Sequence, residues 1–433
     1  MYAAPSLRRV LPAMVIGIAL LALFSALARN IFDYQNTTQR TNTLVSSSNM
    51  KGPVLYTPKN TLPDTWNNIH PFQLFDTHVS SNVIARTYNA IWAAGLGRMR
   101  IYRSINPGMF LSYYIPFNRD YGTFFNNSTI HSLSYWQAAH PDWVLYQCDR
   151  VTPAYQFGDP NVPFDFTNPA VMAWQVQTYA QPASLRGYDA IAADNVDFGN
   201  FYNACGIYKN GQWVQLFSGQ PTDTNWQTAL LNWLSQMGTA LHSLAHPLTL
   251  IPNLAFSGLS PMDPLILQAA DLSDGTLDEG GFTNYGGGYV TGTEWVQHVQ
   301  YIEYLQAENK PCFVVNNLPT MNRPNIQWAL ASYLMGKDHF SEIYITKMQK
   351  YGINSWLAEY NAQVGSPNGS MYQSQNVYWR DYSSGESIVN PDAASTFTIT
   401  LNPSVHYVDL YGNTVSGTVT MLPHSGLVLL IAF

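Results

Sequence analysis

The sequence has 433 residues, of which 46% are hydrophobic, 14% aromatic and only 11% charged, and its net charge is −7. This length fits one large barrel plus a smaller domain. The low charge and the lack of a basic stripe exclude nucleic acid as an expected partner, whereas a neutral surface rich in polar and aromatic groups suits sugars.

Residues 1–28 have the features of an export signal. Two arginines precede the apolar run VLPAMVIGIALLALFSALA, and Ala-Leu-Ala at 26–28 has the small-x-small form of a signal-peptidase site. The run is also long enough to span a bilayer if it is not cleaved, so an N-terminal membrane anchor at 10–28 is the alternative. Both interpretations predict a secreted, extracellular or periplasmic protein, in which residues 29–50 form a flexible tether.

Between about residue 70 and residue 350, short apolar runs alternate with amphipathic stretches, a pattern typical of a parallel sheet covered by helices. The eight runs favour a (β/α)8 TIM barrel over an open doubly wound sheet, and no GxGxxG or P-loop motif follows the first strands. We therefore expect a barrel catalytic domain at 51–358. The expected strands are 72–79, 109–117, 143–149, 188–196, 248–256, 274–282, 311–318 and 341–346. The expected helices are 168–185, 222–245, 261–272, 291–310 and 323–337.

The character of the sequence changes after about residue 358. Short β-branched and aromatic runs are separated by the turn sequences SSG, NPD, YGN and HSG, and no helical period remains. Residues 359–433 are therefore predicted to form a small all-β domain, an antiparallel sandwich.

Three cysteines are present, and their wide spacing contains no CxxC or Cys/His metal pattern. In an exported protein one disulfide is expected to be feasible, and Cys148 and Cys205 are the better-placed pair, because both would follow barrel strands on the same face. Three buried free thiols, with Cys312 among them, are the alternative.

Polar side chains recur where the predicted strands end. In parallel barrels the functional groups gather at these C-terminal strand ends, so the recurrence indicates a shared site. Several of the groups also have a structural alternative, such as a loop cap at Asp197, a structural partner at Asp278, or satisfied loop backbone at the asparagines. The predicted substrate-binding residues are Asp76, Asn118, Asp149, Asn195, Asp197, Asn253, Asp278, Tyr285, Asn316 and Asn317.

Asp194 and Glu279 are the predicted catalytic pair. Hydrolysis of a glycosidic bond needs one carboxyl group that protonates the leaving oxygen and a second, ionised one that attacks the sugar or activates water. Asp194 ends the apolar strand AIAAD, and Glu279 ends TLDE before two glycines that permit close approach of a ligand. The alternative for Asp194 is an Asx-turn. No GxSxG or HExxH motif is present, so we expect neither a serine hydrolase nor a metal site, and no cofactor.

Two of these segments resemble a known family. YDAIAADNVDFGN at residues 188–200 is similar to the fourth strand, and SDGTLDEGGF at 273–282 to a strand near the sixth, of barrel proteins classed as hypothetical glycoside hydrolases. These proteins are distantly similar to endo-polygalactosaminidase and α-galactosidase-like barrels. The tail resembles the β domain that commonly follows glycosidase barrels. The resemblance implies Asp194 as nucleophile or base and Glu279 as general acid; Ala190 departs from the family's glycine.

The sequence thus predicts an exported glycoside hydrolase that cleaves a polysaccharide or oligosaccharide with two carboxylates. The alternative is a non-catalytic carbohydrate-binding protein of the cell surface, built on a degenerate barrel. The sugar, the linkage, the stereochemical outcome and the oligomeric state are not determined by the sequence.

Overall fold

The computed structural model describes residues 61–121, 130–157, 161–285 and 287–432. The predicted export signal and tether lie outside these ranges. Within them, no helix combines the length and the apolar character needed to cross a membrane. The described chain divides into two compact units, which we call the insertion unit (residues 118–171 and 200–225) and the barrel unit (the other described residues).

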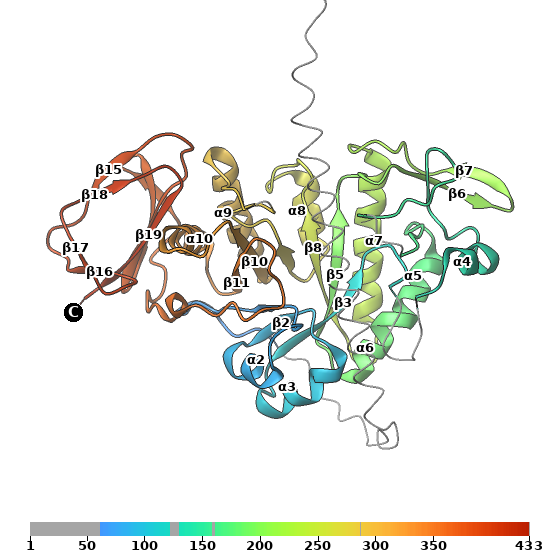
Figure 1. The fold of residues 1–433 in the computed structure, drawn as a ribbon, viewed down its shortest axis with the longest axis horizontal. Coiled ribbons are helices and arrows are strands. Elements are labelled where there is room, and N and C mark those ends of the chain that lie inside the picture. The colour runs from blue at the N-terminus through green and yellow to red at the C-terminus, as the bar shows by residue number, and fades with distance from the viewer. Residues whose placement is uncertain (1–60, 122–129, 158–160, 286, 433) are drawn as a thin grey trace, which may run out of the picture. The chain divides into compact units, whose positions relative to one another are not determined.

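The barrel unit contains a sheet of eight parallel strands, whose order in the sheet is their order along the chain (Figure 1). Ile343 of the last strand also pairs in parallel with Pro71, next to the first strand, so the sheet closes on itself. This arrangement confirms the predicted TIM barrel. The strands are β1 (Gln73–Leu74), β2 (Ala90–Trp92), β3 (Phe110–Pro116), β5 (Ala190–Asp197), β8 (Thr249–Ala255), β9 (Thr276–Asp278), β10 (Cys312–Leu318) and β11 (Ser341–Lys347).

Aromatic side chains fill the barrel near the N-terminal ends of its strands. Phe313 of β10 contacts Phe72, next to β1, and Phe110 of β3. These residues come from strands that are not neighbours in the sheet, so their side chains meet inside the barrel. The interior is a packed core at this level, as is usual for the fold.

Seven of the eight predicted strand segments contain a barrel strand, and one prediction is wrong. The segment 143–149 contributes only β4 (Tyr146–Gln147), which pairs antiparallel with β6 and belongs to a separate three-stranded sheet. The barrel strand missing from the prediction is β2, whose three residues are too short to show a pattern. Because the two errors cancel, Asp194 still lies on the fourth barrel strand.

The five predicted helices are present, with shorter ends. Segment 168–185 becomes α5 (Pro169–Gln175), a π-helical turn (Val176–Ala180) and α6 (Gln181–Arg186). The others are α7 (Thr224–His242), α8 (Pro264–Asp271), α9 (Gly292–Ala307) and α10 (Arg323–Gly336). Two short helices that the sequence did not indicate, α2 (Ser81–Thr87) and α3 (Met99–Ile105), follow β1 and β2.

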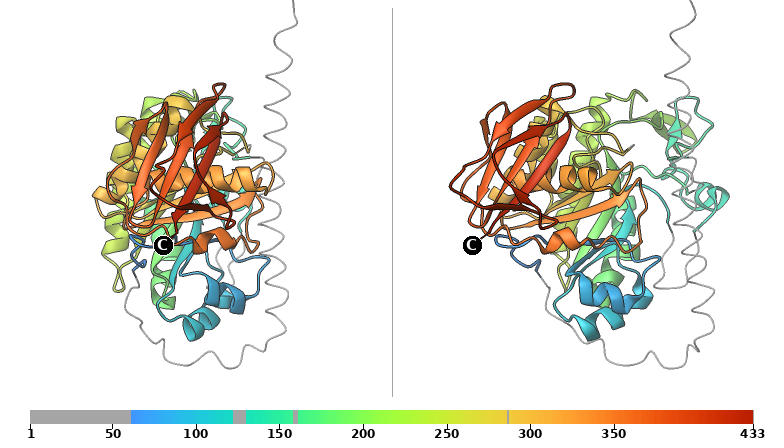
Figure 2. Two further views of the ribbon diagram at one scale, coloured as in Figure 1. Left: turned by 90° about the vertical axis from the view of Figure 1, so that its left-hand side faces the viewer. Right: turned by 60° about the vertical axis from the view of Figure 1, so that its left-hand side comes forward.

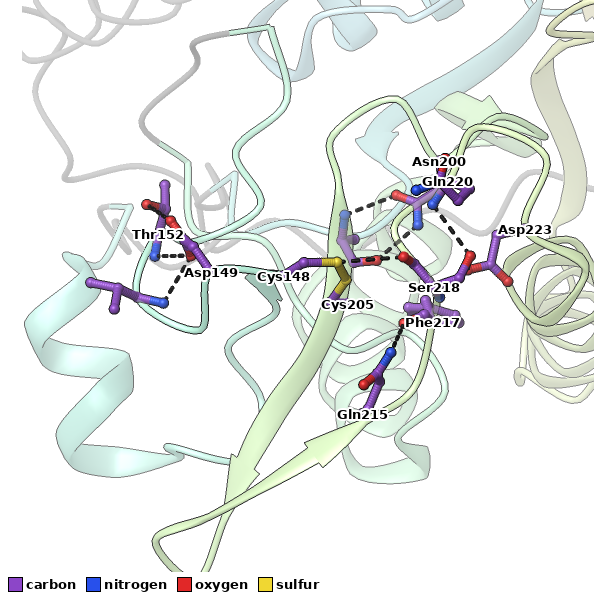
Figure 3. Close-up of a disulfide and its surroundings, with 12 residues drawn as sticks. Cys148, Asp149, Thr152, Asn200, Cys205, Gln215, Phe217, Ser218, Gln220 and Asp223 are labelled. Atoms are coloured by element: carbon purple, nitrogen blue, oxygen red, sulfur yellow. Dashed lines mark hydrogen bonds between the residues drawn. A yellow bond between two sulfur atoms is a disulfide. The ribbon is translucent and has the colours of Figure 1, made fainter.

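The insertion unit is built from two long excursions of the chain, which follow β3 and β5. It contains α4 (Leu133–Ala139) and the sheet of β4, β6 (Ala204–Lys209) and β7 (Gln212–Gln215). A disulfide between Cys148 and Cys205 joins the two excursions (Figure 3), and Cys312 is free and buried. The favoured pairing is thus present, although Cys148 follows β4 and not a barrel strand.

The C-terminal part forms antiparallel sheets, as predicted (Figure 2). A two-stranded sheet, β15 (Phe397–Thr400) and β18 (Thr418–Met421), shares an apolar core with a six-stranded sheet. The six strands are, in spatial order, β12 (Tyr372–Ser374), β13 (Val377–Tyr382), β14 (Gly385–Asn390), β19 (Ser425–Ile431), β16 (Tyr407–Asp409) and β17 (Thr414–Val415).

Helix α10 joins the C-terminal sheet to the barrel. A Cβ atom on Gly426 of β19 would lie 2.6 Å from the Gln327 carbonyl oxygen of α10, so only glycine allows this close approach. Arg380 of β13 is buried and donates hydrogen bonds to the carbonyl oxygens of Leu334 and Lys337 at the end of α10. The C-terminal sheet therefore completes the core around this helix.

Candidate active site

The two predicted catalytic carboxylates come from barrel strands that are separated by one other strand. Asp194 belongs to β5 and Glu279 directly follows β9, while β8 pairs with both of these strands and separates them. Both side chains are half-buried. They are located at the C-terminal ends of their strands, which is where barrel enzymes carry their reactive groups.

A β-bulge directs the Asp194 side chain. The pairing of β5 with β8 runs in register up to Ala193 and resumes at Val196, so Asp194 and Asn195 are left outside the ladder. Asn195 has a φ of 58°, the left-handed region that Asn adopts more easily than most residues. Bulges of this kind bend a strand and re-aim its side chains near active sites. The Asp-Asn sequence at this strand end therefore has a local structural cause.

Hydrogen-bond donors surround the Asp194 carboxylate. Its Oδ1 atom accepts from the Asn195 backbone N–H (2.9 Å) and from the Asn253 side chain (2.9 Å). Its Oδ2 atom accepts from the Tyr114 hydroxyl (2.8 Å) and from the Asn195 side chain (3.2 Å). These four contacts fix the position of the Asp194 carboxyl group.

Asn253 of β8 connects the two carboxylates. Its Nδ2 atom donates to Asp194 Oδ1 at 2.9 Å and to Glu279 Oε2 at 2.6 Å. The nearest oxygens of the two carboxyl groups are therefore at most about 5.5 Å apart, the sum of these distances. The two carboxyl groups are therefore close enough to approach the same bond of a ligand.

The pKa of Glu279 is raised above its ordinary value. Burial raises its pKa to about 7, and the nearby charge of Asp194 acts in the same direction. Hydrogen bonds from Tyr351 and Asn253 oppose the shift but do not cancel it. A carboxyl group with a pKa near neutrality is in the range that general acid and base catalysis uses.

The loop that carries Glu279 is fixed by its neighbour Asp278. Asp278 Oδ1 accepts from the backbone N–H groups of Gly280 (3.1 Å) and Gly281 (2.9 Å), and its Oδ2 atom lies 3.0 Å from His298 Nδ1. Asp278 is buried, and these contacts agree with its structural alternative, while its contact with a substrate stays a prediction. Gly281 is needed for a different reason from the one predicted, because its Cβ would lie 2.2 Å from the Val315 carbonyl oxygen.

The two asparagines of β10 bind the surrounding loops. Asn317 Nδ2 donates to the Glu279 carbonyl oxygen and to the Tyr351 hydroxyl, each at 3.1 Å. Asn316 Oδ1 accepts from the Phe282 backbone N–H at 3.1 Å. These contacts correspond to the alternative of satisfied loop backbone, and they link Glu279 to Tyr351.

Tyr285 lies close to both members of the pair and to Asp197. Asp197 Oδ1 accepts from the Gly199 N–H at 2.7 Å and from the Ser257 hydroxyl, and burial raises its pKa to about 6. The Tyr285 side chain is half-buried, and its pKa is raised by burial and by the charges of Glu279, Asp278, Asp197 and Asp194. Its phenol is therefore a neutral hydrogen-bond donor that faces several carboxylates.

The aromatic side chains of Phe75 and Tyr114 contact each other beside Asp194, with ring centroids 5.8 Å apart. Phe75 also contacts Trp92 and Tyr351. Phe75 and Tyr114 are half-exposed, whereas Trp92 is buried. The two half-exposed rings offer apolar surface next to the nucleophile candidate.

Three predicted site residues make their contacts elsewhere. Asp76 is buried, and its Oδ2 atom accepts from the Gly95 N–H (2.9 Å) and the Tyr102 hydroxyl (2.7 Å). In the insertion unit, Asn118 Oδ1 accepts from Gln156 (2.8 Å), and Asp149 holds a turn through the N–H groups of residues 151 and 152 (Figure 3). Their contact with a substrate stays a prediction.

The sequence did not point to Tyr114, Tyr351 or His298, each of which contacts a carboxylate of the site. Tyr114 follows another Tyr in a strand that is buried on both faces, so alternation could not select it. No group of three or more His, Cys, Asp or Glu side chains placed to hold a metal ion occurs within residues 61–121, 130–157, 161–285 and 287–432.

Comparisons with solved structures gave several α/β-barrel enzymes at low identity. The maltogenic α-amylase of Thermotoga neapolitana is 11% identical, with a TM-score of 0.42, 85% of this chain covered and 100% of that chain. The α-amylase of Malbranchea cinnamomea is 11% identical (TM-score 0.44, 84% and 97% covered). The GH36 α-galactosidase of Geobacillus stearothermophilus is 10% identical (TM-score 0.41, 84% and 56% covered).

A search of the curated proteins found no match. The family comparison, however, is decisive, because a model described as "Hypothetical glycosyl hydrolase family 15" matches residues 103–386, well over half of the chain. The matched segment includes both Asp194 and Glu279. The chain therefore belongs to hypothetical glycosyl hydrolase family 15.

Proposed function

We propose that this protein hydrolyses O-glycosidic bonds of a polysaccharide or oligosaccharide, with Asp194 as nucleophile and Glu279 as general acid and base. The observation that carries this proposal is the pair itself. Asp194 lies on β5, and Glu279 directly follows β9. Both half-buried carboxylates accept a hydrogen bond from the same side-chain nitrogen of Asn253. The separation of at most about 5.5 Å fits a double displacement that retains the anomeric configuration.

In the first step, Glu279 donates its proton to the glycosidic oxygen as the bond from that oxygen to the anomeric carbon breaks. An Asp194 oxygen forms a bond to the same carbon, and the leaving sugar departs as an alcohol. The Asp194 carboxylate, which four hydrogen bonds hold in place, supplies the electron pair. The products of this step are a glycosyl ester of Asp194 and an ionised Glu279.

In the second step, Glu279 takes a proton from water as the water oxygen bonds to the anomeric carbon. The ester bond to Asp194 breaks, and both carboxyl groups return to their first state. The change in the role of Glu279 has a physical cause, because esterified Asp194 is neutral and no longer raises the pKa of its neighbour. The pKa of Glu279 therefore falls once Asp194 is esterified, so Glu279 is ionised when a base is needed.

The half-exposed rings of Phe75 and Tyr114 support a sugar as substrate. Aromatic faces stack on the apolar faces of pyranose rings, while the hydroxyls of the sugar need neutral donors and acceptors. Tyr285 supplies such a group near the pair. The same features would serve the alternative, a protein that binds a glycan without cleaving it.

The test is hydrolysis of a panel of polysaccharides and aryl glycosides by the purified protein and by Asp194→Asn, Glu279→Gln and Asp274→Asn. Asp274 is the matched control, because it precedes β9 and pairs with His242 at the other end of the barrel strands. We expect turnover by the wild type and by Asp274→Asn alone. Glycan binding without product would favour the non-catalytic alternative, and equal turnover by all variants would overturn the assignment of the pair.

We also propose that the protein is exported. The Cys148–Cys205 disulfide supports this location, since disulfides persist in oxidising compartments and are rare in the cytosol. The export-type features of residues 1–28 agree with it. Cell fractionation with protease protection tests the location, and N-terminal sequencing of the mature protein distinguishes cleavage near residue 28 from retention as an anchor. Recovery in the cytosol would contradict export.

A further inference from the structure

Asn253 occupies a special position relative to the two carboxylates. It lies on β8, the strand between the strand of Asp194 and the strand that leads to Glu279, and its backbone register partner on β9 is Leu277. Its side chain is buried. An amide on this strand end is therefore the group best placed to reach both carboxyl groups at once.

The amide has one possible orientation. Its nitrogen donates one hydrogen to Asp194 and the other to Glu279, and an exchange of nitrogen and oxygen would place a lone pair against two carboxylates. Its Oδ1 atom is buried without a hydrogen-bond partner among the described residues. An unsatisfied buried acceptor costs about 1–3 kcal/mol, and the two charge-assisted bonds of the nitrogen offset this cost.

We propose that Asn253 is a positioning residue, which ties the nucleophile and the acid into one unit and directs the transferable proton of Glu279 to its Oε1 atom. This inference rests on the proposed function and adds a role for a residue that the sequence indicated only as a sugar ligand. The amide nitrogen can donate but cannot accept. Oε2 must therefore remain an acceptor in both protonation states, and the proton occupies Oε1.

Other groups that face Glu279 also affect its ionisation. They are the carboxylate of Asp194 from β5, the carboxylate of Asp278 from β9, the phenol of Tyr285 from the following loop and the phenol of Tyr351 from the segment after β11. Asn253 differs from all of them, because it is uncharged at every pH and contacts both members of the pair. Asn253→Ala therefore tests positioning without adding or removing a titrating neighbour, whereas Asn253→Asp replaces the donor with a further carboxyl group.

The experiment is a pH titration of the Glu279 carboxyl carbon by NMR, in protein labelled with 13C at the Glu side chains. The wild type, Asn253→Ala and the nearly isosteric Asn253→Asp are compared, and Glu279→Gln assigns the signal. Without the donor, the ionised form loses support, so we expect the midpoint to rise by about one pH unit in Asn253→Ala. A larger rise is expected in Asn253→Asp, because a third carboxylate is added.

Asn390→Ala is the matched control. Asn390 is a buried asparagine of the C-terminal sheet whose Nδ2 atom donates to three carbonyl oxygens, so its removal destabilises the fold without contact to the pair. We expect its Glu279 midpoint to equal that of the wild type. An unchanged midpoint in both Asn253 variants, or the same shift in Asn390→Ala, would overturn the proposal. If Asn253→Ala does not fold, Asn253→Asp decides.

A kinetic measurement adds an independent readout where turnover is found. An aryl glycoside with a 2,4-dinitrophenyl leaving group needs little protonation, whereas the unsubstituted phenyl glycoside needs full help from the acid. We expect Asn253→Ala to slow the phenyl glycoside at least tenfold more than the dinitrophenyl one; equal losses would contradict a role in placing the proton. The titration needs no turnover, so it judges Asn253 even if the proposed hydrolysis is not found.

Discussion

Glu279, which is half-buried, and Glu342, which is buried, are two glutamates of one barrel with very different surroundings. Glu279, at the C-terminal end of the strands, receives hydrogen bonds from Asn253 and Tyr351 and faces Asp194. Glu342 lies near the N-terminal end of β11, beside Phe313 of the packed interior. Its carboxyl oxygens have no hydrogen-bond partner among the described residues, and His70 Nδ1 is 3.9 Å from Oε1.

Burial raises the pKa of both carboxyl groups, yet only one of them is suited to catalysis. Burial alone raises the pKa of Glu342 well above its ordinary value, and no hydrogen-bond donor among the described residues stabilises its ionised form. At Glu279, burial and the charge of Asp194 raise the pKa while two hydrogen-bond donors lower it, and the result is about 7, from which the group can both lose and regain a proton. The comparison indicates that burial alone favours the neutral carboxyl group, whereas hydrogen-bond donors keep the pKa in a range where the group can lose and regain a proton.

The largest expected effect concerns turnover. With the best substrate of the panel, Asp194→Asn should reduce kcat/KM by at least about 10⁴-fold, and Glu279→Gln by about 10²–10⁴-fold. Glu342→Gln is the matched control, because it alters a buried glutamate of the same barrel without touching the pair. Its kcat/KM should stay within about twofold of the wild type. A large loss of kcat/KM in Glu342→Gln would contradict the claim that Glu279, and not Glu342, takes part in turnover.

The next effect concerns stability and its dependence on pH. A carboxyl group whose pKa is raised by folding binds a proton more tightly in the native state, so the free energy of unfolding falls as pH rises from the unfolded value toward the native one. Glu342→Gln removes this loss. The variant should gain about 1–3 kcal/mol over the wild type at pH 8 relative to pH 4, measured by urea unfolding at both values. No pH-dependent difference would mean that Glu342 is solvated or paired.

Activity should fall as pH rises through about 7, because Glu279 must be protonated for the first step. Tyr351→Phe sharpens this prediction. It removes one donor to Glu279, so the alkaline limb of the kcat/KM profile should move upward by a fraction of a pH unit. Tyr102→Phe, which removes a donor to Asp76 instead, should leave the limb in place. A downward movement in Tyr351→Phe would show that water replaces the lost hydroxyl.

The sequence predicted the barrel because its strands are short apolar runs between amphipathic helices. It failed where local pattern carries no tertiary information. Segment 143–149 has the composition of a buried strand but pairs with β6 in the insertion unit, and the three residues of β2 are too few to show any period. Neither error affected the fourth strand, where Asp194 is found.

The sequence could select Asp194 and Glu279, which the structure brings together, because a carboxylate directly after an apolar strand is unusual in a chain with few charges. The surrounding contacts were not predictable. Tyr351 comes from the segment after the last strand, and Asn253 could not be distinguished from an asparagine that satisfies loop backbone. Asp76 and Asp149 also follow apolar runs, but the structure uses both to hold nearby loops. Polar strand ends therefore indicate where a site lies and do not identify its members.

The most direct test of the central claim is to trap the glycosyl-enzyme intermediate. The protein is incubated with 2-deoxy-2-fluoro glycosyl fluorides of the sugars released from the panel, digested, and mapped by mass spectrometry. The account predicts one added sugar, attached to Asp194 in the wild type and absent from Asp194→Asn. A sugar attached to another carboxylate, or turnover with inversion of configuration at the anomeric carbon, would contradict it.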